Sequence, residues 1–310
     1  MVPEFEIYPG VDHWLQFLSN HHVEELGLES YDIDQPMPYH LFTFDHLAHL
    51  YLTNVQIKLP PAFKGFSSLL RLELQNVYIA PWEFKKLISK CPSLEYMDLD
   101  DLDCDTGELE IDAPNLNLLA SLADFATFEP YEIDWNMIEV LGKLSSLEAD
   151  GGFLQFLARG GVPQKLPTNL NHLRVLSLSH IGFEHIVEVK CALCLIRSSP
   201  NLQSLKIISE KSSDADMETT TRYLKAQQKH KIPLRRLKIV MIWCISGREP
   251  EMEFVKLLLL TATALRKLEF GSAYEAKEEA RSNMLKQLVS FRRASPKAQI
   301  IFRDNGYPLS

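Results

Sequence analysis

Two cysteines with the spacing Cys-x-x-Cys, Cys191 and Cys194, form the most recognisable potential metal site in the sequence. A structural zinc site needs a second pair of cysteine or histidine ligands at a comparable spacing. Cys91, Cys104 and Cys244 each stand alone, and no histidine pair completes the set. Both thiols lie in a helical pattern of apolar residues. We therefore expect them to pack in the core, and we expect no metal ion and no cofactor.

An acidic run, Asp101-x-Asp103-x-Asp105, has the spacing that opens a calcium-binding loop. An EF-hand loop needs glycine at its sixth position to make a sharp turn, and Thr106 stands there. The loop would then have to continue as a helix, which Ala113 and Pro114 do not favour. The pattern is more typical of a solvated acidic loop than of a calcium site.

Motifs for covalent chemistry and for nucleotide binding are absent from the sequence. It contains no glycine-rich phosphate loop and no Gly-x-Ser-x-Gly, and nothing marks a nucleophile, so we expect no catalytic centre. Basic residues cluster in residues 225–238 and 281–297, but aromatic residues are not interleaved with them as in many nucleic-acid-binding surfaces. We expect no nucleic-acid partner and interpret the clusters as solvated faces.

The composition is that of a globular protein. The 310 residues are 46% hydrophobic and 24% charged. No uncharged apolar run reaches the roughly 18 residues of a membrane span, so no membrane partner is expected. Five cysteines, no Asn-x-Ser/Thr sequon and no basic N-terminal segment indicate a reducing compartment, so we expect the nucleus or the cytoplasm.

Charge is distributed unevenly along the chain. Residues 1–150 carry 27 acidic and 7 basic side chains, whereas residues 151–310 carry 14 and 25. Opposed charges of this size can attract each other or two different partners. The sequence leaves both possibilities open, together with two ordinary solvated surfaces.

A repeated apolar pattern dominates the sequence and defines its fold class. An apolar residue, two variable residues and two alternating apolar residues recur, as in Leu47-x-x-Leu50-x-Leu52 and Leu173-x-x-Leu176-x-Leu178. The central apolar positions are 26, 50, 72, 97, 119, 147, 176, 205, 237 and 268. Their spacing of 22 to 32 residues is close to that of leucine-rich repeats. The sequence predicts an α/β leucine-rich repeat solenoid, or horseshoe, of about ten repeats, with a parallel concave β-sheet and convex helices.

Several segments between the repeats have their own predicted structure. Helices are expected at residues 12–18, 184–197, 216–229, 251–261 and 277–291, and a closing strand at 298–302. Residues 151–169 contain two Gly-Gly pairs and two prolines, which predicts an irregular insertion or hinge. We expect the solenoid to occupy residues 1–240 and to continue into C-terminal repeats and a cap at 241–310.

The phrases that connect the repeats resemble a known family. Ser89–Leu99 is similar to the "CPxLExLxL" phrase, and Leu109–Leu116 to the "LxIxAPNL" phrase, of plant F-box leucine-rich repeat proteins. Val11–Leu28 resembles the opening of their first repeat, and Leu237–Ala262 resembles their C-terminal FBD domain. The resemblance covers about residues 11 to 303. It implies that the segment 241–310 is FBD-like.

The resemblance also implies a function. Family members use the repeats to recognise a target protein and an N-terminal F-box to dock on a Skp-type adaptor and a cullin, forming an SCF-type ubiquitin ligase. The resemblance implies a non-catalytic substrate receptor. Ten residues precede the first-repeat phrase, too few for a helical F-box, so we expect the F-box to be absent. The alternative is a stand-alone interaction scaffold or decoy that recruits no ligase.

A target protein would bind the concave sheet, as it does in repeat solenoids. The candidate residues flank the apolar positions of each repeat, and we expect them to change from mostly acidic to basic along the chain. Tyr51, Arg71 and Tyr96 are the best anchors, since Tyr and Arg are enriched at interface hot spots. The full set is Glu25, His49, Tyr51, Arg71, Glu73, Tyr96, Asp98, Glu148, Asp150, Ser177, Lys206, Arg236, Lys238 and Lys267.

Overall fold

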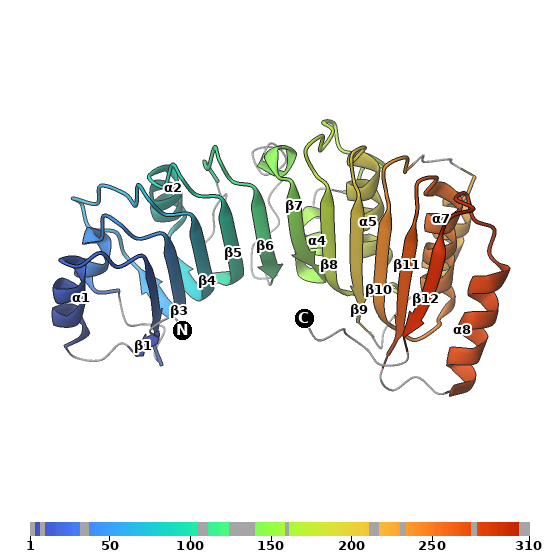
Figure 1. Ribbon diagram of the computed structural model, residues 1–310, viewed down its shortest axis with the longest axis horizontal. Coiled ribbons are helices and arrows are strands. Elements are labelled where there is room, and N and C mark those ends of the chain that lie inside the picture. Colours follow the sequence, from blue (N-terminus) through green and yellow to red (C-terminus); the bar gives the residue numbers. More distant parts are fainter. Residues whose placement is uncertain are drawn as a thin grey trace. The chain divides into compact units, whose positions relative to one another are not determined.

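The computed structural model describes residues 4–6, 10–31, 37–103, 111–123, 140–158, 161–210, 217–229, 234–273 and 278–303. The chain divides into two compact units, Met1–Leu144 and Ser145–Ser310. Each unit consists of parallel strands that pair in chain order. Helices and loops run back from the end of one strand to the start of the next (Figure 1).

The first unit contains the strands β1 to β6. Each strand pairs in parallel with the next one along the chain. The strands are β1 (Glu4–Glu6), β2 (Glu25–Glu29), β3 (His49–Ile57), β4 (Arg71–Ile79), β5 (Tyr96–Asp103) and β6 (Leu118–Ala123). The helices are α1 (Val11–Ser19), the 3₁₀ helix η1 (Tyr39–Thr43) and α2 (Pro81–Ser89).

The repeated leucines form the core of this unit because alternate side chains of a strand point to opposite faces. In register, Leu26, Leu50, Leu72, Met97 and Leu119 stand side by side, and each is at most 1% exposed. The predicted repeat frame is confirmed in this unit. The residues between these positions point to the opposite side of the sheet, which we call the open face.

A left-handed corner follows the core positions of several strands. Asn54, Asn76 and Asp101 occupy the same place in three successive repeats and have φ values of 55°, 48° and 54°. Asparagine and aspartate tolerate this conformation better than most residues do. The Asn76 amide also donates a hydrogen bond to Asn54 Oδ1 at 2.7 Å. The corner returns the next residue to the core, where Val55 and its equivalents are buried.

The second unit repeats the plan with longer helices. Its strands are β7 (Ser146–Asp150), β8 (Val175–Ile181), β9 (Ser204–Ser209), β10 (Ile239–Ile245), β11 (Lys267–Ser272) and β12 (Gln299–Arg303). Its helices are α4 (Gly151–Ala158), α5 (Ile186–Ser198), α6 (Met217–Gln227), α7 (Glu249–Thr261) and α8 (Glu278–Ser290). Figure 1 shows α4, α5 and α7 behind the strands. His180 and Cys244 hold the left-handed corner here, with φ values of 52° and 61°.

Two buried glutamates hold backbone groups of the second unit. Glu188 Oε2 accepts the Gly182 N–H at 2.8 Å, and the Gln155 amide donates to Oε1. Glu251 lies at the start of α7 and is 4% exposed. Its carboxylate accepts hydrogen bonds from the backbone N–H groups of Ser246 and Arg248, which makes it the acidic half of a capping box.

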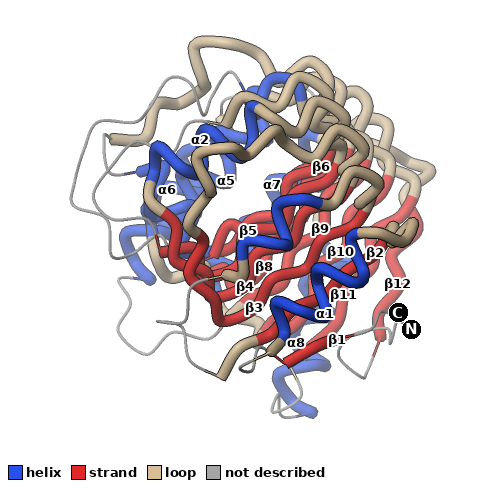
Figure 2. Tube along the Cα trace, turned by 90° about the vertical axis from the view of Figure 1, so that its left-hand side faces the viewer, coloured by secondary structure: helices blue, strands red, loops and turns tan. Residues whose placement is uncertain are grey.

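The turns before successive strands are linked by a ladder of side-chain hydrogen bonds. Ser93 Oγ donates to the Ser67 carbonyl, and the Asn115 amide donates to the Pro92 carbonyl, each at 2.8 Å. In the second unit the Asn201 amide donates to the Asn171 carbonyl at 2.7 Å. Figure 2 shows connecting loops stacked on one another. Each rung satisfies a backbone acceptor of the preceding repeat and so favours one stacking register.

Most of the predicted elements are confirmed. The five expected helices correspond to α1, α5, α6, α7 and α8, and the closing strand is β12. The interpretation of residues 151–169 as wholly irregular is wrong, because Gly151–Ala158 is helix α4. Asp150 Oδ1 accepts the Phe153 N–H at 2.8 Å and caps this helix despite its two glycines. Both units are therefore segments of an α/β leucine-rich repeat solenoid. The expected boundary at residue 240 stays a prediction.

Candidate protein-binding face

The open face of the first unit brings together the predicted residues of β2 to β5. In one row of the sheet Glu25, His49, Arg71 and Tyr96 are neighbours. In the next row the neighbours are Gly27, Tyr51, Glu73 and Asp98. The order follows from the strand register, since every pair of strands aligns the same position of the repeat.

Arg71 is the centre of a polar cluster on this face. Its Nε donates to Glu73 Oε1, and its guanidinium carbon lies 3.8 Å from the centroid of the Tyr96 ring. The Tyr96 hydroxyl donates to Asp98 Oδ2 at 3.2 Å. Both partners are arranged as expected for a guanidinium, which pairs with carboxylates and stacks on aromatic faces. The cluster is thus fixed before any partner binds.

The two tyrosines of this face lie in a negative electrostatic environment. Burial raises the pKa of Tyr51, and the carboxylates of Glu73 and Glu25 raise it further. Burial and the neighbouring Asp98 raise the pKa of Tyr96 to about 12. Both phenols are therefore neutral at physiological pH, and their surroundings disfavour a further negative charge.

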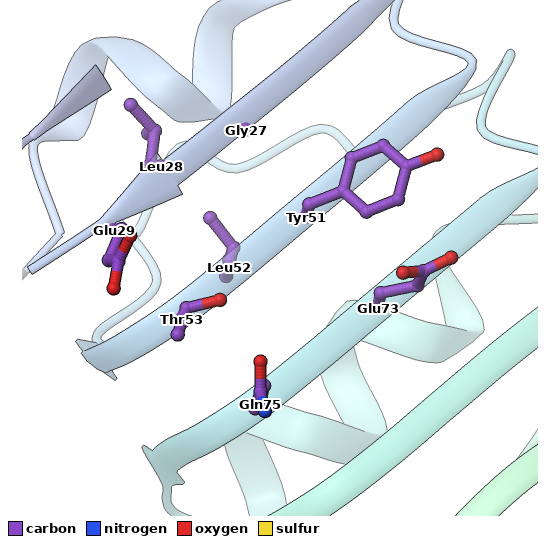
Figure 3. Close-up of a pocket in the computed structure, with 8 residues that line it drawn as sticks. All are labelled: Gly27, Leu28, Glu29, Tyr51, Leu52, Thr53, Glu73 and Gln75. Atoms are coloured by element: carbon purple, nitrogen blue, oxygen red, sulfur yellow. The ribbon is translucent and has the colours of Figure 1, made fainter. Parts of the chain in front are cut away.

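A hollow of about 390 Å³ lies beside Tyr51, between β2, β3 and β4 (Figure 3). It forms where Gly27 contributes no side chain to the row that contains Tyr51 and Glu73. Its polar lining consists of Glu29, Tyr51, Thr53, Glu73 and Gln75. No basic side chain lines it. Sequence reasoning missed Gly27 and Glu29, although both occupy open-face positions of the first repeat.

The open face of the second unit has a mixed charge. Lys206 lies on β9, and Glu148 and Ser177 occupy the same row of the sheet. Asp150 ends β7, and its carboxylate caps α4 as described above. All four predicted residues are on strands, but Ser177 is only 8% exposed.

An ion-paired glutamate joins the last two strands of this face. Lys267 Nζ lies 2.6 Å and Arg303 Nη2 lies 3.2 Å from Glu269 Oε1. The hydrogen bond from Lys267 lowers the pKa of Glu269 although burial opposes the shift. Sequence reasoning missed Glu269 and Arg303, which follow Lys267 in the frame of the last two repeats.

The predicted positions Arg236 and Lys238 are not on the open face of a strand. In register, Val240 aligns with Leu205 and Leu268, so the expected frame centred on Leu237 is wrong by three residues. Arg236 lies in the turn before β10, and Lys238 is the residue that precedes the strand. The corresponding open-face residues are Ile239, which is 38% exposed, and Met241. The expected change from acidic to basic side chains along the open face is therefore interrupted at β10, where the open-face residues are apolar.

The two cysteines of the Cys-x-x-Cys pattern are core residues. Cys191 and Cys194 lie on α5, each 4% exposed, and burial raises the pKa of Cys191 to about 12. Within the described residues, no group of three or more His, Cys, Asp or Glu side chains could hold a metal ion. The acidic run from Asp101 continues into residues 104–110, which lie outside the described residues. No described helix has the length and apolar character needed to cross a bilayer.

The parallel sheet, its repeated leucines and its exposed polar face define a leucine-rich repeat protein. The repeats at residues 11–133 match the family profile described as "FBD-associated F-box protein At5g56370, LRR repeats". The chain is 31% identical to the F-box/FBD/LRR-repeat protein At1g13570 of Arabidopsis thaliana over 320 aligned positions. The alignment covers 95% of this chain and 76% of that protein. The chain belongs to the plant F-box/FBD/LRR-repeat family.

A solved leucine-rich repeat protein of Leptospira interrogans, LIC12759, is also similar. The superposition covers 96% of this chain and 81% of that one, with 16% identity and a TM-score of 0.34. At this score the likeness adds nothing to the fold, which rests on the strand register given above. Family and fold together make the chain a protein-interaction module.

Proposed function

We propose that this chain is the target-recognition part of an SCF-type ubiquitin ligase and that it binds its target on the open face of β2 to β5. The observation that carries the proposal is the ordered cluster of Arg71, Glu73, Tyr96 and Asp98 on a sheet face opposite the core. Preorganised Tyr and Arg side chains on a rigid sheet lose little conformational entropy when a partner binds. Membership of the F-box/FBD/LRR-repeat family supports the link to a ligase.

The proposed chemistry is recognition rather than catalysis. The chain would hold a target protein, while a Skp-type adaptor and a cullin would connect it to the ubiquitin-transferring subunits. The absence of a catalytic centre, of a cofactor and of a nucleic-acid partner stays a prediction. We place this function in the nucleus or the cytoplasm, where the other ligase components would be available.

The test is affinity purification of the tagged 310-residue chain from plant cells treated with a proteasome inhibitor. Because no F-box is expected in the 310 residues, the adaptor would have to dock on another of their surfaces. Adaptor and cullin should then be recovered in equal amounts with the unmodified chain, with Tyr96→Ala and with Glu95→Gln. Glu95 is an exposed residue immediately before β5 and serves as the matched control. The chain is crosslinked to its bound proteins before purification. Proteins bound on the open face should be lost only with Tyr96→Ala.

Two outcomes would contradict the proposal. Recovery of crosslinked proteins without adaptor or cullin would make the chain a scaffold or decoy. Recovery of the same proteins with and without the Tyr96 ring would remove the open face from target binding.

A further inference from the structure

We propose that the hollow between Gly27, Tyr51 and Glu73 receives an arginine side chain from a basic segment of the target protein. This inference rests on the proposed target-binding function and specifies the chemistry of the target.

The open face of β2 to β5 is predominantly acidic. The open-face strand positions of β2 to β5 carry five carboxylates and a single strongly basic side chain, that of Arg71. The carboxylates are Glu25, Glu29, Glu73, Asp98 and Asp100. The Arg71 guanidinium is already paired with Glu73 and stacked on Tyr96, so it does not neutralise the rest. A basic partner would therefore be attracted and an acidic one repelled.

Glu29 provides a carboxylate at the border of the hollow. It borders the hollow, it is exposed, and none of the described basic side chains forms an ion pair with it. Glu73 borders the same hollow opposite Gly27, with Tyr51 between them in the row. The close-up shows the Tyr51 ring standing beside the empty place at Gly27 (Figure 3). A long basic side chain lying along the hollow would have the Tyr51 ring and the Glu73 carboxylate at one end and the Glu29 carboxylate at the other (Figure 3).

The protein already contains one guanidinium that pairs with a carboxylate and stacks on a tyrosine ring. Arg71 satisfies its guanidinium with one carboxylate and one tyrosine ring. The lining of the hollow contains the same two kinds of group, the Glu29 carboxylate and the Tyr51 ring, and includes no arginine. A planar guanidinium fits such a site better than an ammonium, because it can pair with a carboxylate and stack at the same time. The phenol of Tyr51 is neutral, because burial first, and then the carboxylates of Glu73 and Glu25, raise its pKa although Arg71 opposes the shift.

The size and lining of the hollow are compatible with a single basic side chain. Pockets that enclose a whole small molecule have volumes of about 300–1,000 Å³ and are mostly apolar. At about 390 Å³ this hollow lies near the lower end of that range, and its lining includes four polar side chains besides Tyr51. It suits one long basic side chain whose backbone continues along the sheet.

The experiment measures binding of a fluorescein-labelled peptide that contains three arginines separated by glycines, by fluorescence anisotropy with the full 310-residue chain. We expect a dissociation constant on the order of 100 µM at low salt and weaker binding at higher ionic strength. The lysine version should bind several-fold more weakly, and the citrulline and glutamate versions should show no saturable binding.

Variants of the chain locate the site. Tyr51→Ala should weaken arginine-peptide binding by about tenfold, whereas Tyr51→Phe should change it by less than about twofold. Gly27→Val would fill the hollow and should weaken binding as much as Tyr51→Ala. Glu29→Gln should weaken it by about fivefold, whereas the control Glu95→Gln should leave it unchanged. Circular dichroism and the melting temperature verify that each variant is folded, and Glu29→Gln is an exposed substitution that does not touch the core.

Several results would overturn the inference. These are no saturable binding up to about 1 mM chain, equal binding of the citrulline peptide, and equal binding by the unmodified chain and Glu29→Gln. Concentration-dependent self-association that Tyr51→Ala abolishes would assign the hollow to a second copy instead. If the inference fails while Tyr96→Ala still removes the crosslinked targets, target binding on the open face stands and only the basic chemistry of the target is wrong.

Discussion

Glu251 offers the most direct test of how the second unit is held together. Three groups donate to its buried carboxylate: the Ser246 N–H at 3.1 Å, the Arg248 N–H at 2.8 Å and the Ser209 hydroxyl at 3.2 Å. Replacing Glu251 by alanine removes the acceptor of all three hydrogen bonds at once. The first two donors fix the loop between β10 and α7, and the third connects this loop to β9.

The cost follows from what the three donors do after the substitution. A buried donor that loses its partner costs about 1–3 kcal/mol, and the loss of a capping residue costs about 1 kcal/mol. Ser209 is only 7% exposed, so its hydroxyl loses most, whereas Ser246 and Arg248 are half-buried and can be partly rehydrated. Relief from burying a carboxylate offsets part of the loss, because burial raises the pKa of Glu251 despite its hydrogen bonds. We expect Glu251→Ala to lower the free energy of unfolding by about 3 kcal/mol.

Urea unfolding measures this change. Of the tryptophans with described burial, Trp243 of the second unit is fully buried whereas Trp14 and Trp82 are exposed, so the change in tryptophan emission reports mainly on the unfolding of that unit, alongside far-UV circular dichroism. The matched control is Glu249→Ala on the same helix, whose exposed carboxylate pairs with Lys225 among the described residues and whose loss should leave the free energy of unfolding nearly unchanged. A loss below about 1 kcal/mol for Glu251→Ala, or equal losses for the two variants, would refute the assignment of Glu251 as the residue that fixes this loop.

Three further substitutions test other contacts of the second unit. Gly271→Ala places a Cβ 2.3 Å from the Trp243 ring and should destabilise the unit by about 1–3 kcal/mol with a change in Trp243 emission, whereas Gly142→Ala, with no atom within 4 Å, should be neutral by the same urea assay. Cys244→Asn should stabilise the chain by about 0.5–1 kcal/mol, because asparagine tolerates the left-handed corner better; an unchanged or lower melting temperature would contradict this. Burial raises the pKa of Glu188 above its ordinary value, so the folded state binds its proton more tightly than the unfolded state does. The stability associated with that proton is present at acidic pH and is lost as pH rises through the raised pKa; the unmodified chain should therefore lose stability relative to Glu188→Gln over that interval, and parallel pH profiles of the two chains would contradict the prediction.

The repeat made most of the fold predictable, and its failures have physical causes. Leu50, Leu72 and Leu205 are separated from the next apolar run by polar turns, so only one frame fits them. Residues 239–245 are apolar at every position, and frames centred on Leu237 and on Val240 match the pattern almost equally well. Pairing with β9 and β11 decides between them, and that information is not local.

Helix α4 was missed because the two glycines at its start weigh against a helix. Asp150 three residues before Phe153 was the available signal, since aspartate is a strong N-cap. The glycine is needed because a Cβ at Gly151 would lie 2.6 Å from the His180 carbonyl. The open-face residues were predictable wherever the frame was right, but the hollow was not. It depends on the combination of Gly27, Tyr51 and Glu73 on three strands, which becomes visible only when the strands are in register.

The corner asparagines mark equivalent points of successive coils, and such points define the length of chain that a gene can gain or lose without disturbing the fold. Asn54 and Asn76 are 22 residues apart and hold the same backbone geometry at the same point of successive coils. Unequal recombination that joins one asparagine codon to the other would remove or duplicate one complete coil without shifting the frame of its neighbours. A recombination event that joins non-equivalent positions of two coils would turn leucines toward water. Chains of this kind can therefore gain or lose binding surface in whole coils, leaving the remaining coils intact for selection on the altered surface.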